Sequence, residues 1–182
     1  LLYVSIHSLH KISKYNGPDG REIVLNKLGS PSWKTLKQNY CKAAFFPEFE
    51  TYFFDIYNTL SNISLLSKIN CFLIKEICNF LGIKTVLRQA NEFELLPEKT
   101  ERLISICLQT KATHYISGPA GSNYIDVEIF RKAGIEVEYY NYEGYQEYKQ
   151  LYPPFEHGVT ILDLIFNEGK NAALFMKSFK SP

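Results

Sequence analysis

Residues 113–140, THYISGPAGSNYIDVEIFRKAGIEVEYY, contain the pattern that decides the fold. The runs 113–117 and 135–140 are short, largely apolar and bounded by turn residues, which is typical of strands. Between them, Asp126 is placed to cap a short helix and Gly134 to end it. A strand, a helix and a second strand in this order form a parallel pair with a right-handed crossover. The stretch therefore predicts an α/β protein.

A further strand and helix precede this stretch. Residues 84–88 are a strand candidate, and residues 97–110 form an amphipathic pattern that predicts a helix. Added to residues 113–140, they predict a short parallel sheet built from β-α-β-α-β units.

The rest of the chain is predicted to contain an N-terminal β-hairpin and additional helices. Residues 2–28 contain two strand-like runs around a Gly-rich turn, which is typical of a hairpin. Apolar residues recur at helical spacing over 46–60 and again over 65–81, where a glycine follows as a stop signal. Residues 159–166 form a C-terminal amphipathic segment.

The composition is that of a single folded domain spanning residues 1–182. The 182 residues can bury one good core and are too few for two ordinary domains. A hydrophobic fraction of 46% and a charged fraction of 21% exclude a mainly disordered chain. With a net charge of +1 and no basic cluster, the sequence lacks the electrostatic footprint of a nucleic-acid binder. We expect a small-molecule partner, and no pattern indicates an oligomeric state.

The sequence offers no signal for membrane insertion, export or a cofactor. No run approaches about 18 consecutive apolar residues, and the first residues lack the charged region of a signal peptide, so we expect a cytoplasmic protein without a membrane span. The four cysteines form no CxxC pair and are expected to be reduced. Neither a dinucleotide fingerprint, a P-loop nor a metal-ligand cluster occurs, so we expect no cofactor and no metal.

The leading candidate ligand site is the glycine-bearing loop 117–124, hereafter the glycine loop. It follows a predicted strand, and open parallel sheets bind ligands beyond the carboxyl ends of their strands. Its candidate ligand-binding residues are Ser117, Gly118, Gly121, Ser122, Asn123 and Tyr124. The two glycines allow positive φ or a close approach of backbone to ligand, and the other side chains supply hydrogen-bonding groups. A structural strand-to-helix turn fits the same residues, so both interpretations stay open.

Three charged residues complete the candidate site. Lys99 and Arg102 lie at the start of the predicted helix 97–110, which parallel topology places at the same edge as the glycine loop. They are candidate ligands for an anion, although charges at a helix start also fit a solvent-facing role. Asp163 lies in the apolar run 161–165, where an unpaired carboxylate is costly, so it faces solvent, caps backbone or serves a site. We take Asp163 as the candidate catalytic residue, acting as a base or an orienting group.

Several stretches of this sequence resemble the WbqC-like family. They keep the order of the family, cover most of the chain, and comprise residues 39–46 (NYCKAAFF), 99–107 (KTERLISIC), 115–124 (YISGPAGSNY), 134–137 (GIEV) and 160–167 (TILDLIFN). The most specific is the stretch through the glycine loop. Two family features differ: the opening segment resembling Gln-Pro-x-x-x-Pro-x-x-Gly-Tyr-Phe does not occur, and Leu9-His10-Lys11-Ile12 stands where the family has Arg-Asn-Lys-Ile.

The resemblance implies a role in surface-polysaccharide synthesis. Members of the family are often encoded among genes for O-antigen and other surface glycans, and transfer of glycine to an amino sugar has been proposed for some. The implied function is a transferase that attaches an aminoacyl group to a nucleotide-linked amino sugar, with a nucleotide sugar as the small-molecule partner. A non-catalytic nucleotide-sugar binding module and a degenerate family relative are the alternatives.

Overall fold

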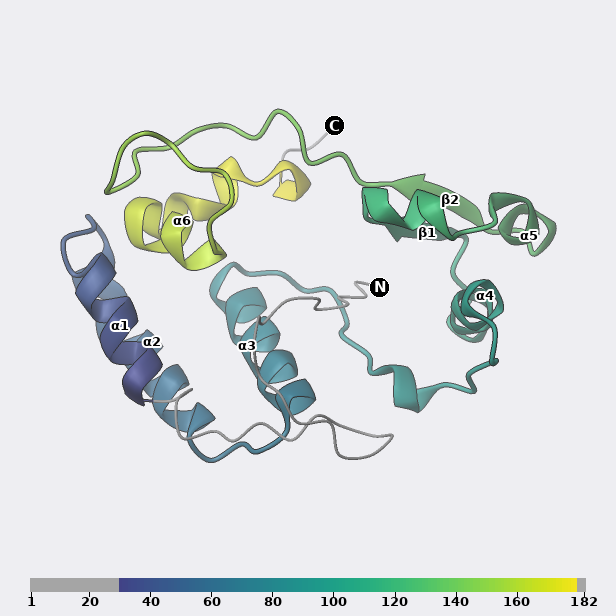
Figure 1. Cartoon of the computed structure of the whole chain (residues 1–182), viewed down its shortest axis with the longest axis horizontal. Coiled ribbons are helices and arrows are strands. Elements are labelled where there is room, and N and C mark those ends of the chain that lie inside the picture. The colour runs from purple at the N-terminus through teal and green to yellow at the C-terminus, as the bar shows by residue number, and fades with distance from the viewer. Residues whose placement is uncertain (1–29, 180–182) are drawn as a thin grey trace. The chain divides into compact units, whose positions relative to one another are not determined.

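The computed structural model describes residues 30–179, which divide into two compact units (Figure 1). The first, here called the α/β unit, is Val86–Gly144. The second, the helical unit, combines residues 30–85 with residues 145–179. The predicted hairpin at residues 2–28 lies outside the described residues. The expectation that the chain forms a single domain stays a prediction.

The α/β unit contains the predicted β-α-β core. Its elements are η1 (Ala90–Glu92), α4 (Lys99–Gln109), β1 (His114–Ser117), η2 (Pro119–Asn123), α5 (Val127–Lys132) and β2 (Glu136–Tyr139). β1 and β2 are parallel, in a register that runs from His114 opposite Glu136 to Ser117 opposite Tyr139. Gly134 has a φ of 74°, which ends α5 in the left-handed conformation that glycine tolerates best. The mixed helix and sheet content agrees with an α/β class.

One predicted strand is not formed, so the sheet is smaller than expected. Residues 84–88 have no strand conformation, and the described part of the chain contains two strands rather than three. The reason is that a strand exists only through hydrogen bonds to a neighbour, and a short β-branched run does not specify one. Val86 illustrates this, because 64% of its surface is exposed. The arrangement described is therefore β-α-β, not β-α-β-α-β.

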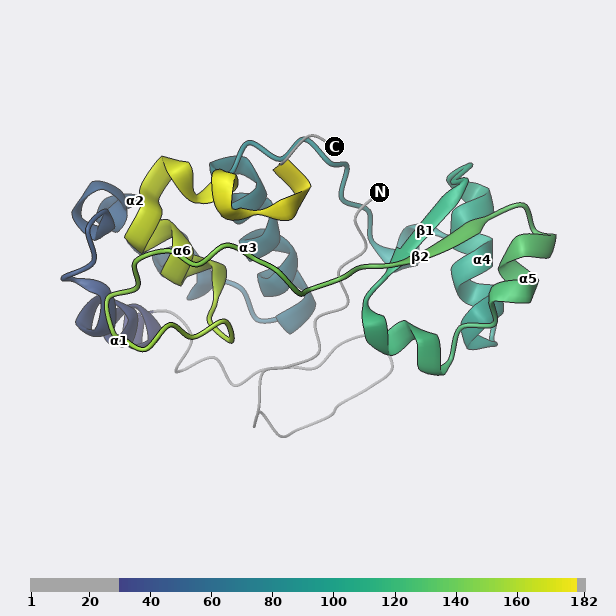
Figure 2. The ribbon, with the colours of Figure 1, turned by 90° about the horizontal axis from the view of Figure 1, so that it is seen from above.

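Helices cover one face of the two-stranded sheet. Tyr115, Val137 and Tyr139 alternate toward a small core that includes Ile104 of α4 and Phe130 of α5. Figure 2 shows α4 and α5 beside the two strands. This packing fixes the carboxyl end of β1 relative to the helices that flank it.

The helical unit is held together by an aromatic core. It contains α1 (Ser30–Tyr40), α2 (Phe46–Leu60), α3 (Leu66–Phe80), α6 (Ile161–Glu168), η3 (Gly169–Phe175) and η4 (Lys177–Phe179). α2 buries the apolar stripe predicted from its sequence, and Phe53 is 1% exposed. Phe166 of α6 is fully buried, with its ring centroid 4.9 Å from that of Phe46 and 5.2 Å from that of Phe53. Aromatic pairs at these distances add to the stability that burial alone gives.

Candidate functional site

The glycine loop is packed tightly at the end of β1. Ser117 is buried, and a Cβ added to Gly121 would collide with its hydroxyl oxygen and lie 2.9 Å from Cδ1 of Ile125. Neither Gly118, with a φ of −68°, nor Gly121 is among the positive-φ glycines of the described residues. The predicted close approach therefore occurs at Gly121, and it is to the protein's own Ser117 side chain.

Much of the hydrogen bonding in the loop is internal. The N–H of Gly121 donates to the carbonyl of Gly118 at 2.9 Å, and the N–H of Tyr124 donates to the carbonyl of Gly121 at 3.1 Å. The Ser122 hydroxyl donates to the carbonyl of Pro119 at 2.8 Å. These bonds fix a 3₁₀ turn and use groups that sequence reasoning had offered to a ligand. The side chains of Asn123 and Tyr124 are exposed.

The start of α4 lies beside this loop. The Thr100 hydroxyl is 3.4 Å from the carbonyl oxygen of Tyr124, a long hydrogen bond that links the first turn of α4 to the end of η2. Lys99 is the first residue of α4 and is exposed. The start of α4 and the end of the glycine loop therefore lie side by side, although the parallel strand expected before α4 is not formed.

Arg102 has a structural role in the described conformation. Its Nε donates to the carbonyl of Leu96 at 3.0 Å and an Nη donates to the carbonyl of Pro97 at 2.7 Å. At the end of α4, Gln109 accepts a hydrogen bond from the N–H of Glu94 at 3.1 Å and donates to the carbonyl of Glu94 at 2.9 Å. These α4 side chains hold the preceding segment against the helix.

A cavity of about 480 Å³ lies between α4 and α5, away from the glycine loop. Its lining residues are Glu94, Leu96, Glu101, Ile104, Ser105, Leu108, Gln109, Ile129 and Ala133. None of the predicted ligand-binding residues lines this cavity. The ligand site at the glycine loop therefore stays a prediction.

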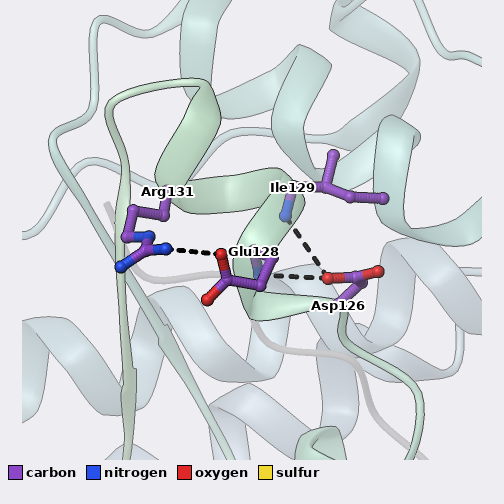
Figure 3. A network of polar contacts seen from close by, with 4 residues as sticks. All are labelled: Asp126, Glu128, Ile129 and Arg131. Carbon is purple, nitrogen blue, oxygen red and sulfur yellow. Dashed lines mark hydrogen bonds and ion pairs between the residues drawn. The ribbon is translucent and has the colours of Figure 1, made fainter.

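Asp126 closes the loop by starting the crossover helix. Its carboxylate accepts hydrogen bonds from the N–H groups of Glu128 at 3.0 Å and Ile129 at 3.3 Å, as the sequence predicted for an N-cap (Figure 3). Arg131 and Glu128, which form an ion pair at 2.6 Å on the same helix, are largely exposed. The cap fixes where the loop ends and the helix begins.

Asp163 belongs to the helical unit, whereas the other predicted site residues belong to the α/β unit. It is 6% exposed, and its Oδ2 accepts hydrogen bonds from the Tyr148 hydroxyl at 2.6 Å and from Nε2 of Gln150 at 3.0 Å. Thr160 caps the N-terminus of α6, and the Thr160 hydroxyl accepts from the N–H of Leu162 at 3.0 Å. Asp163 therefore joins α6 to the tyrosine-rich loop of residues 140–152, which contains Tyr148.

The carboxylate of Asp163 affects two tyrosines. Partial burial, together with the hydrogen bond to Asp163, raises the pKa of Tyr40 to about 12. The same causes, burial first, raise the pKa of Tyr148 from its ordinary value. Both phenols therefore stay protonated at neutral pH and donate to the carboxylate.

Sequence reasoning missed the partners of Asp163. Tyr148 and Gln150 are fifteen and thirteen residues away in the chain, and Tyr40 lies in a different helix. Their residue types were visible in the tyrosine-rich stretch, but no spacing rule links a loop tyrosine to one particular carboxylate. The only available signal was the cost of burying an unpaired Asp163, which required some partner.

Residues 30–179 contain neither a metal-binding cluster nor a membrane-spanning helix. No group of three or more His, Cys, Asp or Glu side chains in this range could hold a metal ion. Within the same range, none of the helices is long and apolar enough to cross a membrane.

The fold and the loop define a mixed α/β protein with a short parallel strand pair and a tightly packed glycine turn. The WbqC-like protein family matches residues 21–174, and the chain belongs to this family. It is similar to the uncharacterized protein Rv1507c of Mycobacterium tuberculosis, with 41% identity over 147 residues. The match covers 80% of this chain and 62% of that relative, so the chain spans less than two thirds of the relative's length. No solved structure matches the chain.

Proposed function

We propose that this protein is a transferase in the synthesis of surface-polysaccharide precursors, including O-antigen. In the proposed reaction it attaches an aminoacyl group, such as glycine, to the amine of a nucleotide-linked amino sugar. Membership of the WbqC-like family suggests a role in polysaccharide biosynthesis and supports the proposed pathway. The observation that carries the site is the junction of the glycine loop with the start of α4, through Thr100 and Tyr124.

The chemistry assigned to the site follows from its groups. The amine of the sugar attacks the carbonyl of an activated aminoacyl donor, an amide bond forms, and the bond to the donor's leaving group breaks. Exposed Lys99 at the first turn of α4 would offset the negative charge of a phosphate, which the helix N-terminus also favours. Asn123 and Tyr124 supply exposed hydrogen-bonding groups for the sugar. Gly118, Gly121 and Ser122 form the frame of the glycine loop, and the Ser117 hydroxyl lies at its base.

Arg102 and Asp163 take supporting parts in this proposal. Arg102 is held by two backbone carbonyls, so we assign it to positioning the segment before α4. Oδ2 of Asp163 already accepts two hydrogen bonds, which favours an orienting group over a free base. The second candidate function is a nucleotide-sugar binding module without chemistry. It is favoured because the carboxylate of the proposed base, Asp163, is already hydrogen-bonded to Tyr148 and Gln150.

Turnover distinguishes the two candidates. The protein is incubated with uridine diphosphate linked to an amino sugar with a free amine, together with a glycyl thioester or glycyl-tRNA, and the products are analysed by mass spectrometry. The transferase proposal expects glycylated nucleotide sugar, with the yield lowered in Lys99→Ala. Saturable binding of the nucleotide sugar without any product, across both donors, would favour the binding module.

A further inference from the structure

The loop after β2 reaches the glycine loop. Because β1 and β2 are parallel, the segments that follow them leave the sheet at the same edge. The N–H of Tyr140 donates to the carbonyl of Ser117 at 2.8 Å, which ties the end of one strand to the end of the other. Two residues later, the hydroxyl oxygen of Tyr142 lies 3.4 Å from the position that a Cβ on Gly118 would occupy. Tyr142 therefore lies directly beside Gly118 of the glycine loop.

Tyr142 combines exposure with support from a neighbour. Its side chain is 63% exposed, and its ring centroid is 5.2 Å from that of Tyr140, at an interplanar angle of 56°. A tyrosine ring held in this way offers an apolar face and a polar hydroxyl to a ligand at low cost in conformational entropy. Tyr142 was part of the tyrosine-rich stretch of the sequence, and no role had been assigned to it.

Ser117 gives the same edge a buried polar group. Its side chain is 8% exposed. The hydroxyl points toward Gly121, inside the glycine loop. A serine hydroxyl at this position can donate a hydrogen bond to a phosphate oxygen bound at the loop.

We infer that Tyr142 is the sugar-binding residue of this site, packing its ring against the hexose of a nucleotide sugar while Ser117 donates to the adjacent phosphate. This inference rests on the proposed function. The hexose, not the nucleobase, is assigned to Tyr142 because the sugar is bonded directly to the distal phosphate, whereas the ribose separates the base from the diphosphate. Lys99, at the start of α4, lies in the segment that contacts the other end of the loop and would balance the phosphate charge.

The test compares binding of two probes to four proteins. Dissociation constants for uridine diphosphate glucosamine, which has the free amine of the proposed acceptor, and for uridine diphosphate alone are measured by calorimetry with the unsubstituted chain, Tyr142→Ala, Tyr142→Phe and the control Tyr152→Ala. Tyr152 is a matched control because it is also 63% exposed and belongs to the helical unit. We expect Tyr142→Ala to weaken binding of the nucleotide sugar about tenfold and Tyr142→Phe to weaken it less, because the phenylalanine keeps the ring. Binding of uridine diphosphate alone, the melting temperature and the control should be unchanged.

The outcomes separate this inference from the proposed function. Equal affinity of Tyr142→Ala and the unsubstituted chain for the nucleotide sugar would overturn the role of Tyr142 and leave the proposed function standing. An equal loss for both probes would also overturn it, since Tyr142 would then contact the nucleotide. If the unsubstituted chain bound neither probe, the inference and the proposed function would both fall.

Discussion

Gly118 and Gly121 lie in the same turn but differ in the space beside their α-carbons. A Cβ on Gly118 would make an ordinary 3.4 Å contact with the Tyr142 hydroxyl, whereas a Cβ on Gly121 would overlap Ser117 and crowd Ile125. The sequence showed that a glycine here permits close approach, but not what approaches. That information depends on the tertiary neighbours of the loop, which no local pattern specifies.

Gly121→Ala should therefore destabilise the α/β unit, whereas Gly118→Ala should not. We expect a loss of about 1–3 kcal/mol in the free energy of unfolding for Gly121→Ala, because the added methyl group must displace buried neighbours. For Gly118→Ala we expect a change within about 0.5 kcal/mol. Urea denaturation followed by far-UV circular dichroism measures both. Equal stability of the two variants would show that Gly121 is not packed as described.

Local signals and tertiary contacts also explain which single residues could be predicted. Asp126 caps α5 and Gly134 ends it, because both signals act on backbone groups within a few residues. Arg102 was predicted to bind an anion, but its guanidinium donates to the carbonyls of Leu96 and Pro97. A charge at a helix start can serve either purpose, and only the path of the preceding segment decides between them.

At the scale of elements, Asp163 joins α6 to the tyrosine-rich loop. Asp163→Leu would leave the Tyr148 hydroxyl without this acceptor and the Gln150 amide with the carbonyl of Glu156 instead of both acceptors, so we expect a loss of about 2–4 kcal/mol in stability. Asp163→Asn keeps one acceptor oxygen and should lose less. Urea unfolding followed by the fluorescence of Trp33, in the same unit, measures the change. Asp55→Asn is the control, because Asp55 is exposed on α2 and should change stability by less than about 0.5 kcal/mol.

The variant Asp163→Asn also tests a catalytic role for Asp163 when its stability and its glycyl transfer are measured side by side. If Asp163→Asn keeps the melting temperature of the unsubstituted chain but loses glycyl transfer, Asp163 acts in the reaction and not only in the fold. A parallel decline of stability and transfer indicates that the carboxylate acts through the structure.

Alkaline pH should weaken the contacts of Asp163. The pKa of Tyr40 is raised from its ordinary value of 10.0 to about 12, so above about pH 10 the unfolded chain loses this proton while the folded chain keeps it. Its contribution to stability is complete below pH 10 and is lost as the pH rises toward 12. Urea midpoints at a series of values from about pH 8 to about pH 11 should fall, and they should fall less steeply in Tyr40→Phe. An unchanged slope in Tyr40→Phe would rule out Tyr40 as a source of the decline.

The elements themselves were predictable to the extent that their signals are local. The helical periodicity of α2, its buried stripe, and the stop at Gly82 after α3 are all present in the sequence, as are β1, α5 and β2. Residues 84–88 look like a strand because of their composition, yet a strand also needs a partner, and composition does not name one. The sheet was overestimated for that reason.

At the scale of the whole molecule, the α/β unit is an insertion between two parts of the helical unit in the sequence. The chain enters the α/β unit at Val86 and leaves it after Gly144. We expect the two units to unfold together, as the single domain that the chain length predicts, because a single domain usually unfolds in one cooperative step. The alternative is that each unit unfolds in its own transition, because each has a hydrophobic core of its own.

Trp33 provides the measurement. It is the only tryptophan in the chain and packs on Phe46, with ring centroids 5.9 Å apart, so its fluorescence reports on the helical unit. Gly121→Ala perturbs the α/β unit. If the chain unfolds as one cooperative domain, this substitution lowers the urea midpoint seen by Trp33 fluorescence as much as the midpoint seen by circular dichroism. If Gly121→Ala left the Trp33 midpoint unchanged but lowered the circular dichroism midpoint, the two units would unfold independently, because a change confined to one unit would then leave the stability of the other unaffected.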